Sequence, residues 1–353
     1  MEAFRFGIIG VGGIATNIHL PAMAQIPQAK LIAVADVLES RAKATAERFG
    51  AEAYYSDHTE LLARPDVDAV IVSTWHPFHA PIAIQVLEAG KHLLVQKPMA
   101  TRQEDADRLV EVAGSSGKIA MALPFSFSPA YLKAQALIRD GAIGRVVMAR
   151  ARVAHGGPGP IQRARPGEDE QPNWFYLKEK AVGGAIFDMG VYAISAISGL
   201  VSPIKAVMAR TSTVLREVDV EENAVIVAEF QNGAIGTVET SWDQQASDEQ
   251  ITVYGAEGTI ILRSQIPSPP TSGAMLLLYS QSASFAGAAG WVTVDVPQGE
   301  ARMVDAHRHW VQCVLENRRP LATVEQGRHV VEVMLGAYRS AETGQLVEIA
   351  STF

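Results

Sequence analysis

A lysine and a proline follow an apolar run in the segment LLVQKPMA, which extends from Leu93 to Ala100. If the run is a buried strand, Lys97 lies at the carboxyl end of that strand, and Pro98 prevents regular pairing directly after it. An ammonium group in this place can hold a reacting oxygen or change the pKa of a neighbouring group. On spacing alone, a surface lysine after an edge strand is the simpler interpretation.

An aspartate and a tyrosine stand four positions apart in the segment IFDMGVY. On a helix, the side chains of Asp188 and Tyr192 would lie on one face and could contact one substrate together. Tyrosine can exchange a hydroxyl proton, although its ordinary pKa near ~10 makes it a poor base unless a cation is close. Without further context, Tyr192 would be interpreted as a core aromatic residue.

A glycine-rich turn follows the first apolar run, with Gly10, Gly12 and Gly13 before Ile14 and Ala15. The pattern G-x-G-x-x-A between a strand and a helix is typical of a dinucleotide-binding turn, in which the N-terminus of the helix faces a pyrophosphate. Similar glycine turns also occur by chance, so the interpretation depends on the elements around the turn.

Asp36 ends the second apolar run, where a dinucleotide-binding unit places an acidic ligand of the adenosine ribose. Its charge would repel a 2′-phosphate, so NAD is favoured over NADP, and the nearby Arg41 is the residue that could soften this preference. The alternative is that Asp36 only caps the following helix.

These residues need a sheet that brings strand ends together, and the N-terminal third of the chain has the pattern for one. Apolar runs lie at Phe4 to Ile9, Leu31 to Ala35, Asp68 to Thr74, Lys91 to Gln96 and up to Leu123, with helical patterns between them. This alternation predicts a doubly wound parallel sheet, a Rossmann domain over residues 1–123.

The pattern changes after Pro124. Helices are expected at Pro129 to Asp140, Asp305 to Asn317 and Thr323 to Thr343, and strands at Gly144 to Ala154, Ile204 to Thr213, Glu222 to Phe230, Ala234 to Ser241, Gln250 to Tyr254 and Thr259 to Arg263. Turns such as QNGA and GAEG favour antiparallel pairing. Residues 124–353 are therefore predicted to form an α/β domain with an open, mainly antiparallel sheet, with loops at about 156–184 and 267–274.

The composition excludes several classes of protein. The 353 residues carry a net charge of −8 and no run of Lys or Arg, so nucleic acid or an anionic membrane is not an expected partner. The single cysteine, Cys313, excludes an internal disulfide and a cysteine-rich metal site, and no metal is predicted. With no readable signal peptide or membrane span, a cytoplasmic protein is expected.

Several segments in order resemble the glucose-fructose oxidoreductase, inositol dehydrogenase and MocA (Gfo/Idh/MocA) family. They are GIIGVGGIA, AVAD with SRAKATAERFG, VSTWHPFHAPIAIQVLEAGKHLLVQKPMA, GGAIFDMGVYAI and the C-terminal VLENRRPLATVEQGRHVVEVMLGAYRSAETGQLVEI. The resemblance implies a Rossmann domain followed by an α/β domain with an open sheet. It also implies a nicotinamide-dependent sugar or polyol oxidoreductase that forms homodimers or homotetramers through that sheet.

The resemblance assigns roles to residues. Lys97 corresponds to the catalytic lysine of the family, and Gln96 replaces the usual glutamate of a Glu-Lys-Pro motif, so the ammonium of Lys97 should lose its proton more easily. His79 corresponds to a histidine near the nicotinamide ribose, whereas alone it would be expected to cap a helix or face solvent. The predicted cofactor-binding residues are Gly10, Gly12, Gly13, Ile14, Asp36, Arg41, Thr74, Trp75, His76, His79, Gln96 and Lys97.

The substrate is expected to be neutral, because Phe125 and Ser126 stand where relatives often have arginines. The predicted substrate-binding residues are Phe125, His155, Trp174, Asp188 and Tyr192, with Phe175 beside them. His155 and the two aromatic residues could equally pin a loop to its domain. Arg163 and Arg165 could reach the pocket or face solvent.

The predicted reaction oxidises a secondary alcohol by hydride transfer to nicotinamide. In this hypothesis Tyr192 exchanges the proton, Lys97 tunes it and holds the reacting oxygen, and Asp188 orients a neighbouring hydroxyl. An alternative has Lys97 as the base. Two other functions stay open from sequence: a glycosidase that uses transient oxidation by bound NAD, and a non-catalytic NAD-binding protein.

Overall fold

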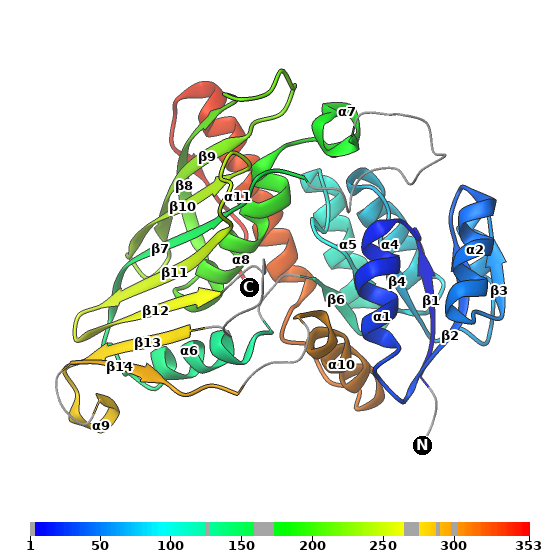
Figure 1. Cartoon of the computed structure of the whole chain (residues 1–353), viewed down its shortest axis with the longest axis horizontal. Coiled ribbons are helices and arrows are strands. Elements are labelled where there is room, and N and C mark those ends of the chain that lie inside the picture. Colours follow the sequence, from blue (N-terminus) through cyan, green and yellow to red (C-terminus); the bar gives the residue numbers. More distant parts are fainter. Residues whose placement is uncertain (1–3, 124–126, 159–172, 265–274, 287–289, 298–301) are drawn as a thin grey trace.

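The structure, a computed structural model, describes residues 4–123, 127–158, 173–264, 275–286, 290–297 and 302–353. Within these residues the chain forms two sheets, one of six strands and one of nine. Figure 1 shows the six-stranded sheet on the right and the nine-stranded sheet on the left, with helices between them.

The six-stranded sheet has the order β3-β2-β1-β4-β5-β6, and every pair in it is parallel. Its strands are β1 (Phe4–Ile9), β2 (Ala29–Ala35), β3 (Ala53–Tyr55), β4 (Ala69–Val72), β5 (His92–Val95) and β6 (Ala120–Ala122). The helices of this part are η1 (Ala15–His19), α1 (Leu20–Met23), α2 (Glu39–Phe49), α3 (His58–Leu62), η2 (His76–Phe78), α4 (His79–Glu88) and α5 (Gln103–Ser116). The predicted doubly wound fold is confirmed.

The strands of this sheet are buried because both faces are covered. All four residues of β4 and the last three of β5 are buried, as their continuous Val, Ile and Leu runs indicate. Since the strands are parallel, Gly10, Asp36, Thr74 and Lys97 all follow strand ends at the same edge. The fold therefore brings together residues that lie up to 87 positions apart.

The nine-stranded sheet has the order β14-β13-β12-β11-β7-β10-β9-β8-β15. Its strands are β7 (Val146–Ala154), β8 (Ile204–Ser212), β9 (Asn223–Phe230), β10 (Ile235–Ser241), β11 (Asp248–Gly255), β12 (Gly258–Ser264), β13 (Met275–Ser280), β14 (Gly290–Val294) and β15 (Val347–Glu348). The open, mainly antiparallel sheet is confirmed, with one exception: β7 and β10 pair in parallel.

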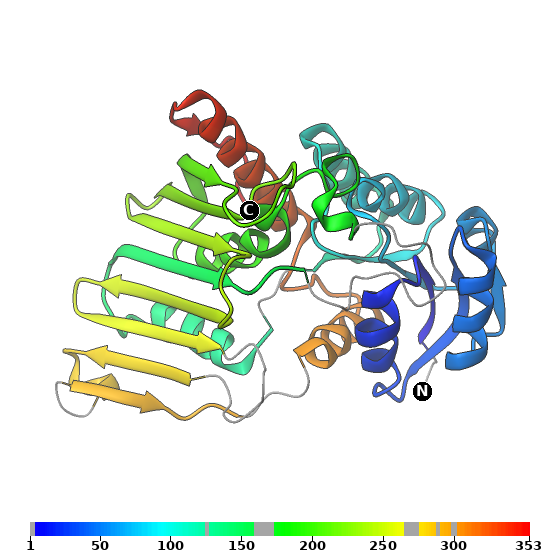
Figure 2. The same cartoon turned by 45° about the horizontal axis from the view of Figure 1, so that its top comes forward.

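Helices cover one face of the nine-stranded sheet. They are α6 (Pro129–Arg139), η5 (Ile186–Gly190), α8 (Val191–Leu200) and α11 (Val324–Thr343), and Figure 2 shows the row of strands with helices behind it. Shorter helices are η4 (Trp174–Tyr176), α7 (Lys178–Ala181) and α9 (Ala283–Ala286). The segment Lys178–Leu200 is apolar and long enough to cross a membrane, but 89% of its apolar window is buried, as in a core helix.

The C-terminal segment returns to the first sheet. The long helix α10 (Arg302–Leu315) buries Trp310 against Phe4 of β1, with ring centroids 5.1 Å apart. Met121 of β6 forms an isolated bridge with Thr323, whose side chain caps α11. The division at residue 123 stays a prediction, and residues far beyond it complete the core of the first half.

Local expectations fail in several places. The helix expected after the glycine turn is present, although it begins as a π-helix, whereas the expected loop over 156–184 contains the short helices η4 and α7. The strands β13, β14 and β15 were not predicted, because they are short or lie between loops. The predicted loop at 267–274 lies outside the described residues.

Candidate active site

Lys97 forms a buried ion pair with Asp188. The Nζ of Lys97 donates to the Asp188 Oδ1 at 2.8 Å and to the main-chain oxygen of the same residue at 2.7 Å. The two side chains are only 12% and 7% exposed. The structure thus brings together a strand end of the first sheet and a helix that packs on the second.

The other carboxylate oxygen of Asp188 also has partners. Trp242 donates from Nε1 to Oδ2 at 3.0 Å, and the Nε2 of His155 lies 3.5 Å from the same oxygen. Both residues directly follow strands that pair in parallel, since Ser241 of β10 lies opposite Ala154 of β7. Burial alone would raise the pKa of Asp188, but Lys97 and His155 hold that pKa well below its ordinary value. Asp188 is therefore a carboxylate at neutral pH.

A second buried carboxylate positions the helix that carries Asp188. Glu221 accepts hydrogen bonds from the main-chain N–H groups of Gly184 and Ile186 at 3.0 and 2.8 Å. The hydroxyl of Tyr338 donates to it at 2.7 Å. Because these N–H groups stand at the start of η5, Glu221 satisfies donors that have no partner within the helix. Neither Glu221 nor Trp242 was predicted to belong to the site, because their partners depend on pairing across the fold.

Tyr192 lies beside the ion pair. The Nζ of Lys97 is 4.7 Å from the centre of the Tyr192 ring. Asp188 belongs to the π-helical turn η5 and Tyr192 to α8, so the predicted shared helix face is built from two kinds of helix. The two side chains nevertheless both contact Lys97.

The expectation that Lys97 loses its proton easily is not met. Burial lowers the pKa of Lys97, but the charge of Asp188 and the neighbouring Tyr192 outweigh burial and raise that pKa above its ordinary value. The anion that the sequence lacks at Gln96 is supplied by Asp188 from 91 residues further along. Gln96 itself binds the main-chain N–H of Lys97 and the ring of His19.

The glycine turn has the geometry that a pyrophosphate needs. Gly10 has a φ of +85°, and a Cβ there would lie 2.5 Å from the carbonyl oxygen of Ser73. A Cβ on Gly12 would meet no atom within 4 Å, so the space in front of the turn is open. Gly13 and the part-exposed Ile14 lead into η1. These residues fit a bound dinucleotide, whose phosphates would lie against main-chain N–H groups.

Asp36 is held at the end of β2 by main-chain groups. Its carboxylate accepts from the N–H of Val11 at 3.0 Å and from the N–H of Leu38 at 3.0 Å. The Nη1 of Arg41 lies 3.5 Å from the same carboxylate. Capping of α2 alone does not account for the bond to Val11, which fixes the carboxylate beside the glycine turn. Its binding of a ribose stays a prediction.

The segment after β4 holds two buried histidines. The Nδ1 of His79 lies 2.7 Å from the carbonyl oxygen of Pro98, and its Nε2 lies 3.0 Å from that of Thr74. His76 contacts the carbonyl oxygen of Ala181 at 3.1 Å, and burial lowers the pKa of His76 to about 3. These contacts tie the turn after β4 to the Lys97–Pro98 turn and to α7.

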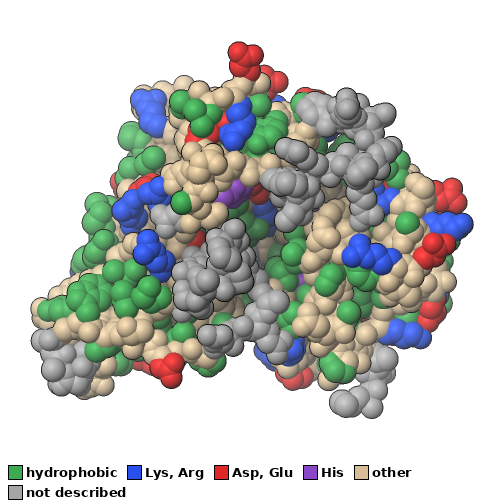
Figure 3. Space-filling view, in the orientation of Figure 1, with side chains coloured by type: hydrophobic (Ala, Val, Ile, Leu, Met, Phe, Trp, Pro, Cys, Tyr) green, Lys and Arg blue, Asp and Glu red, His purple; other side chains and the backbone are tan. Residues whose placement is uncertain are grey.

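Trp75 and Trp174 form an aromatic contact between the two halves. Their ring centroids are 6.2 Å apart and nearly stacked, and the Nζ of Lys180 lies 5.2 Å from the Trp75 ring centre. His76 packs edge-on against Trp174 and against the buried Phe175. The predicted residues Phe125, Ser126, Arg163 and Arg165 lie outside the described residues. Figure 3 shows a hollow between the two halves.

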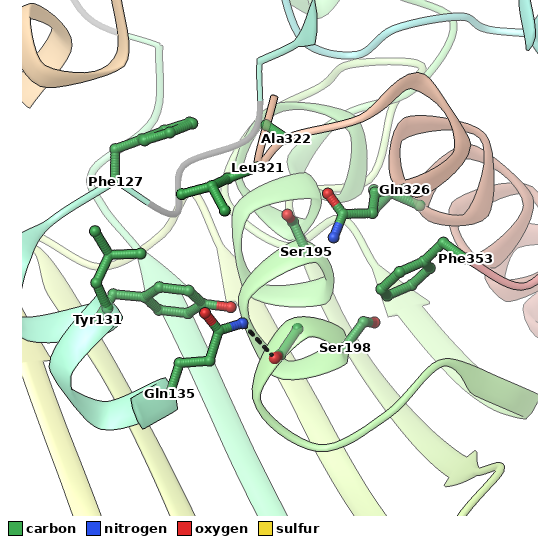
Figure 4. Close-up of a pocket in the computed structure, with 12 residues that line it drawn as sticks. Phe127, Tyr131, Gln135, Ser195, Ser198, Leu321, Ala322, Gln326 and Phe353 are labelled. Carbon is green, nitrogen blue, oxygen red and sulfur yellow. Dashed lines mark hydrogen bonds between the residues drawn. The ribbon is translucent and has the colours of Figure 1, made fainter. Parts of the chain in front are cut away.

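A separate cavity of about 60 Å³ lies between α6, α8 and α11 (Figure 4). Its lining is Phe127, Tyr131, Leu132, Gln135, Ser195, Ser198, Gly199, Leu321, Ala322, Gln326, Val330 and Phe353. Gln135 donates across it to the carbonyl oxygen of Gly199 at 3.1 Å. None of the residues around Lys97 lines this cavity, so we assign no chemistry to it.

Comparisons with known proteins agree with this geometry. A family model described as an oxidoreductase family with an NAD-binding Rossmann fold matches residues 4–123, and a model of the GFO/IDH/MocA C-terminal domain matches residues 131–261. Together the two models cover well over half of the chain.

Curated relatives and solved structures are similar over most of the chain. A levoglucosan dehydrogenase of Pseudarthrobacter phenanthrenivorans is 28% identical over 295 residues, which cover 74% of each chain. A myo-inositol 2-dehydrogenase of Thermotoga maritima is 28% identical over 264 residues, 72% of this chain and 74% of that one. The structure of GenD2 from gentamicin A biosynthesis in complex with NAD has a TM-score of 0.81 at 28% identity and covers 99% of this chain and 97% of its own. The chain belongs to the GFO/IDH/MocA family of NAD-binding oxidoreductases.

Proposed function

We propose that the protein transfers a hydride between a secondary alcohol of a neutral sugar or polyol and NAD, with Lys97, Asp188 and Tyr192 as the reacting cluster. The observation that carries the proposal is the buried Lys97–Asp188 ion pair against the Tyr192 ring, at the sheet edge that also bears the glycine turn. A doubly wound sheet binds its ligands at this edge.

Bound NAD supplies the hydride acceptor at its nicotinamide ring. In its phenolate form, Tyr192 takes the hydroxyl proton as the carbinol carbon loses its hydride, so the alcohol becomes a ketone; the proton then passes from Tyr192 to solvent, which restores the phenolate. Lys97 stays an ammonium, donates to the reacting oxygen and stabilises negative charge on the Tyr192 oxygen. Asp188 holds Lys97 in place. The alternative with Lys97 as the base is disfavoured, because Asp188 opposes loss of its proton.

The substrate class rests on relatives whose names specify levoglucosan and myo-inositol. His155, which is part-exposed beside Asp188, suits a substrate hydroxyl group, and the Trp75–Trp174 contact offers apolar faces for sugar C–H groups. The dehydrogenase function is favoured over a glycosidase, since these relatives are named as dehydrogenases. The complete Lys97–Asp188–Tyr192 cluster also argues against a non-catalytic protein.

For the cofactor, we propose NAD over NADP. The buried Asp36 carboxylate lies beside the glycine turn, where a 2′-phosphate would meet its charge. The Arg41 guanidinium at 3.5 Å offsets part of this charge. The proposed cofactor-binding residues remain those predicted from sequence, with Thr74, Trp75, His76 and His79 on the turn after β4.

The test is NADH formation with a panel of neutral sugars and polyols, for the wild type and Tyr192→Phe. We expect turnover by the wild type on at least one compound and a loss of about 10² to 10⁴ in kcat for the variant, the range for a proton-transfer group. NAD affinity, measured by titration calorimetry, should be unchanged. Equal kcat in the two proteins would remove Tyr192 from the mechanism, and no turnover on any compound would contradict the substrate class.

We further propose that the outer face of the nine-stranded sheet joins copies of this chain. Exposed apolar side chains meet across its strands, with Met208 opposite Val227 and Met148 opposite both Ile235 and Tyr254. Figure 3 shows hydrophobic side chains along that side of the molecule. Val227→Glu should lower the mass found by analytical ultracentrifugation, whereas Val214→Glu, at an exposed valine outside this face, should not.

The buried thiol of Cys313 suits a cytoplasmic protein.

A further inference from the structure

Three side chains next to the proposed site form a hydrogen-bonded chain that hydride transfer does not require. The amide nitrogen of Gln96 lies 3.0 Å from the Nε2 of His19, and the Nδ1 of His19 lies 2.9 Å from the Nε2 of His307. The Nδ1 of His307 contacts the main-chain oxygen of Met303. Gln96 is 7% exposed and both histidines are fully buried, so solvent does not take part in these contacts.

The donor and the acceptor are fixed at both ends of this hydrogen-bonded chain of side chains. The oxygen of Met303 can only accept, so His307 must carry its proton on Nδ1 and accept on Nε2 when it is neutral. At the other end, the main-chain N–H of Lys97 donates to the Gln96 side chain over 2.6 Å. The amide atom that faces it must therefore be the oxygen, which leaves the NH₂ group facing His19. His19 then donates from Nδ1 and accepts on Nε2.

In this arrangement each of the three side chains has a donor facing an acceptor at every contact, and none of the three carries a charge. Burial lowers the pKa of His307 to about 4 and places the pKa of His19 well below its ordinary value, with His307 and His79 as the other groups that lower it. Burial also lowers the pKa of His79. On α10, Asp305 and Arg308 on either side of His307 pair with each other at 3.3 Å.

We propose that Gln96, His19 and His307 are positioning residues that hold the main chain of Lys97 against the dinucleotide-binding helix through an uncharged, proton-ordered chain. His19 ends η1, the helix that starts at the glycine turn, and His307 lies on α10. The chain therefore fixes the reacting lysine relative to the cofactor-binding turn. Its positioning role rests on the proposed function, whereas its proton order does not.

The proton order explains why an amide stands at position 96. A carboxylate there would accept from the N–H of Lys97 equally well, but it could not donate to His19. The Nε2 of His19 would have to donate instead, and because the Nε2 of a neutral His307 can only accept, one of the two rings must then carry a second proton. Gln96→Glu therefore forces an extra proton onto the His19–His307 pair, whereas the wild-type chain needs none.

The first test reads the proton order directly. Nitrogen-detected NMR of the full-length protein, labelled with ¹⁵N in its nine histidines, reports the tautomer of each ring. His19→Gln and His307→Gln identify the two signals. We expect both rings to be neutral Nδ1–H tautomers at pH 7. A cationic ring, or an Nε2–H tautomer at either position, would overturn the proposal.

The second test reverses the direction of the chain. In Gln96→Glu, the new anionic partner raises the pKa of His19. The ion pair between His19 and the introduced carboxylate then contributes fully to stability below about pH 6.5, and this contribution is lost as the pH rises through the raised pKa. The melting temperature should fall between pH 6.5 and 9 relative to the wild type. In Gln96→Glu/His307→Gln, the amide at 307 can donate to the Nδ1 of a neutral His19, so this fall should disappear.

His307→Gln alone is the matched control, because its amide can rotate to accept from His19. It should keep the wild-type profile between pH 6.5 and 9. A Gln96→Glu profile parallel to the wild type, or a fall that persists in the double variant, would contradict the proton order.

The positioning role has its own measurement. Gln96→Met keeps the length of the side chain but removes both hydrogen bonds, and we expect kcat to fall roughly tenfold to a hundredfold, as for a small misplacement of a reacting group. A confirmed proton order with unchanged kcat would refute the positioning role alone. Absence of NADH formation by the wild type would instead refute the proposed function, while the NMR and melting results would still stand.

Discussion

Gln96 and Lys97 are neighbours in sequence, yet they belong to two opposite kinds of buried polar structure. Lys97 enters a charged cluster in which an ammonium and the Asp188 carboxylate neutralise each other. Gln96 enters an uncharged chain in which each group donates once and accepts once. Both arrangements satisfy buried polar groups, but only the first can respond to charge that develops on a substrate.

The two arrangements also differ in what they tolerate. A buried ion pair loses a counter-charge when one partner is removed, so the cost is large. A neutral chain loses a hydrogen bond, and an amide can replace an imidazole if its direction fits. Substitutions in the charged cluster should therefore have larger effects than substitutions in the neutral chain.

The largest effect is expected from Lys97→Met. The variant leaves the Asp188 carboxylate buried without its ammonium, which should lower the free energy of unfolding by about 3 to 5 kcal/mol. It should also lower kcat by at least about 10²-fold, since the donor to the reacting oxygen is lost. Urea unfolding and steady-state kinetics measure both. Lys133→Met, at an exposed lysine of α6, is the control and should change neither quantity.

A smaller effect is expected from Trp242→Phe. This variant removes the indole N–H that donates to Asp188 and should destabilise the fold by about 1.5 to 3 kcal/mol, as for a hydrogen bond to a charged group. Trp310→Phe is a matched control, because Trp310 is also fully buried but its N–H has no partner among the described residues. Urea unfolding measures the effect, and equal destabilisation in the two variants would show that the bond to Asp188 is not what stabilises the fold.

The smallest effect is a difference in pH dependence between wild type and His307→Gln. A buried neutral histidine has a lowered pKa. Its contribution to the stability of the fold is therefore present above about pH 6.5 and is lost as the pH falls toward its pKa in the folded protein, which is about 4 for His307. Wild-type melting temperature should therefore fall between pH 6.5 and 4.5, and less steeply in the variant. The Lys97–Asp188 pair keeps both charges over this range. Identical slopes would show that His307 is not neutral.

Much of the first sheet was predictable from sequence because its signals are local. Phe4–Ile9 is a strand with the predicted bounds, and α2 ends at Gly50, which has the left-handed conformation expected of a glycine cap. The convergence of Gly10, Asp36 and Lys97 on one edge follows from parallel pairing alone. The π-helical turns and the parallel pairing of β7 with β10 were missed, because neither has a periodicity of its own in a single sequence.

The sequence by itself determined which residues stand at strand ends and which pair of side chains, Asp188 and Tyr192, would share a helix face. Tertiary structure decided their electrostatics. Asp188 reaches Lys97 across 91 residues, Trp242 reaches Asp188 through the β7–β10 register, and Gln96 finds His19 77 residues away. Local patterns set backbone conformation, whereas pKa values and proton order depend on burial and on neighbours that only the folded chain brings within a few ångströms.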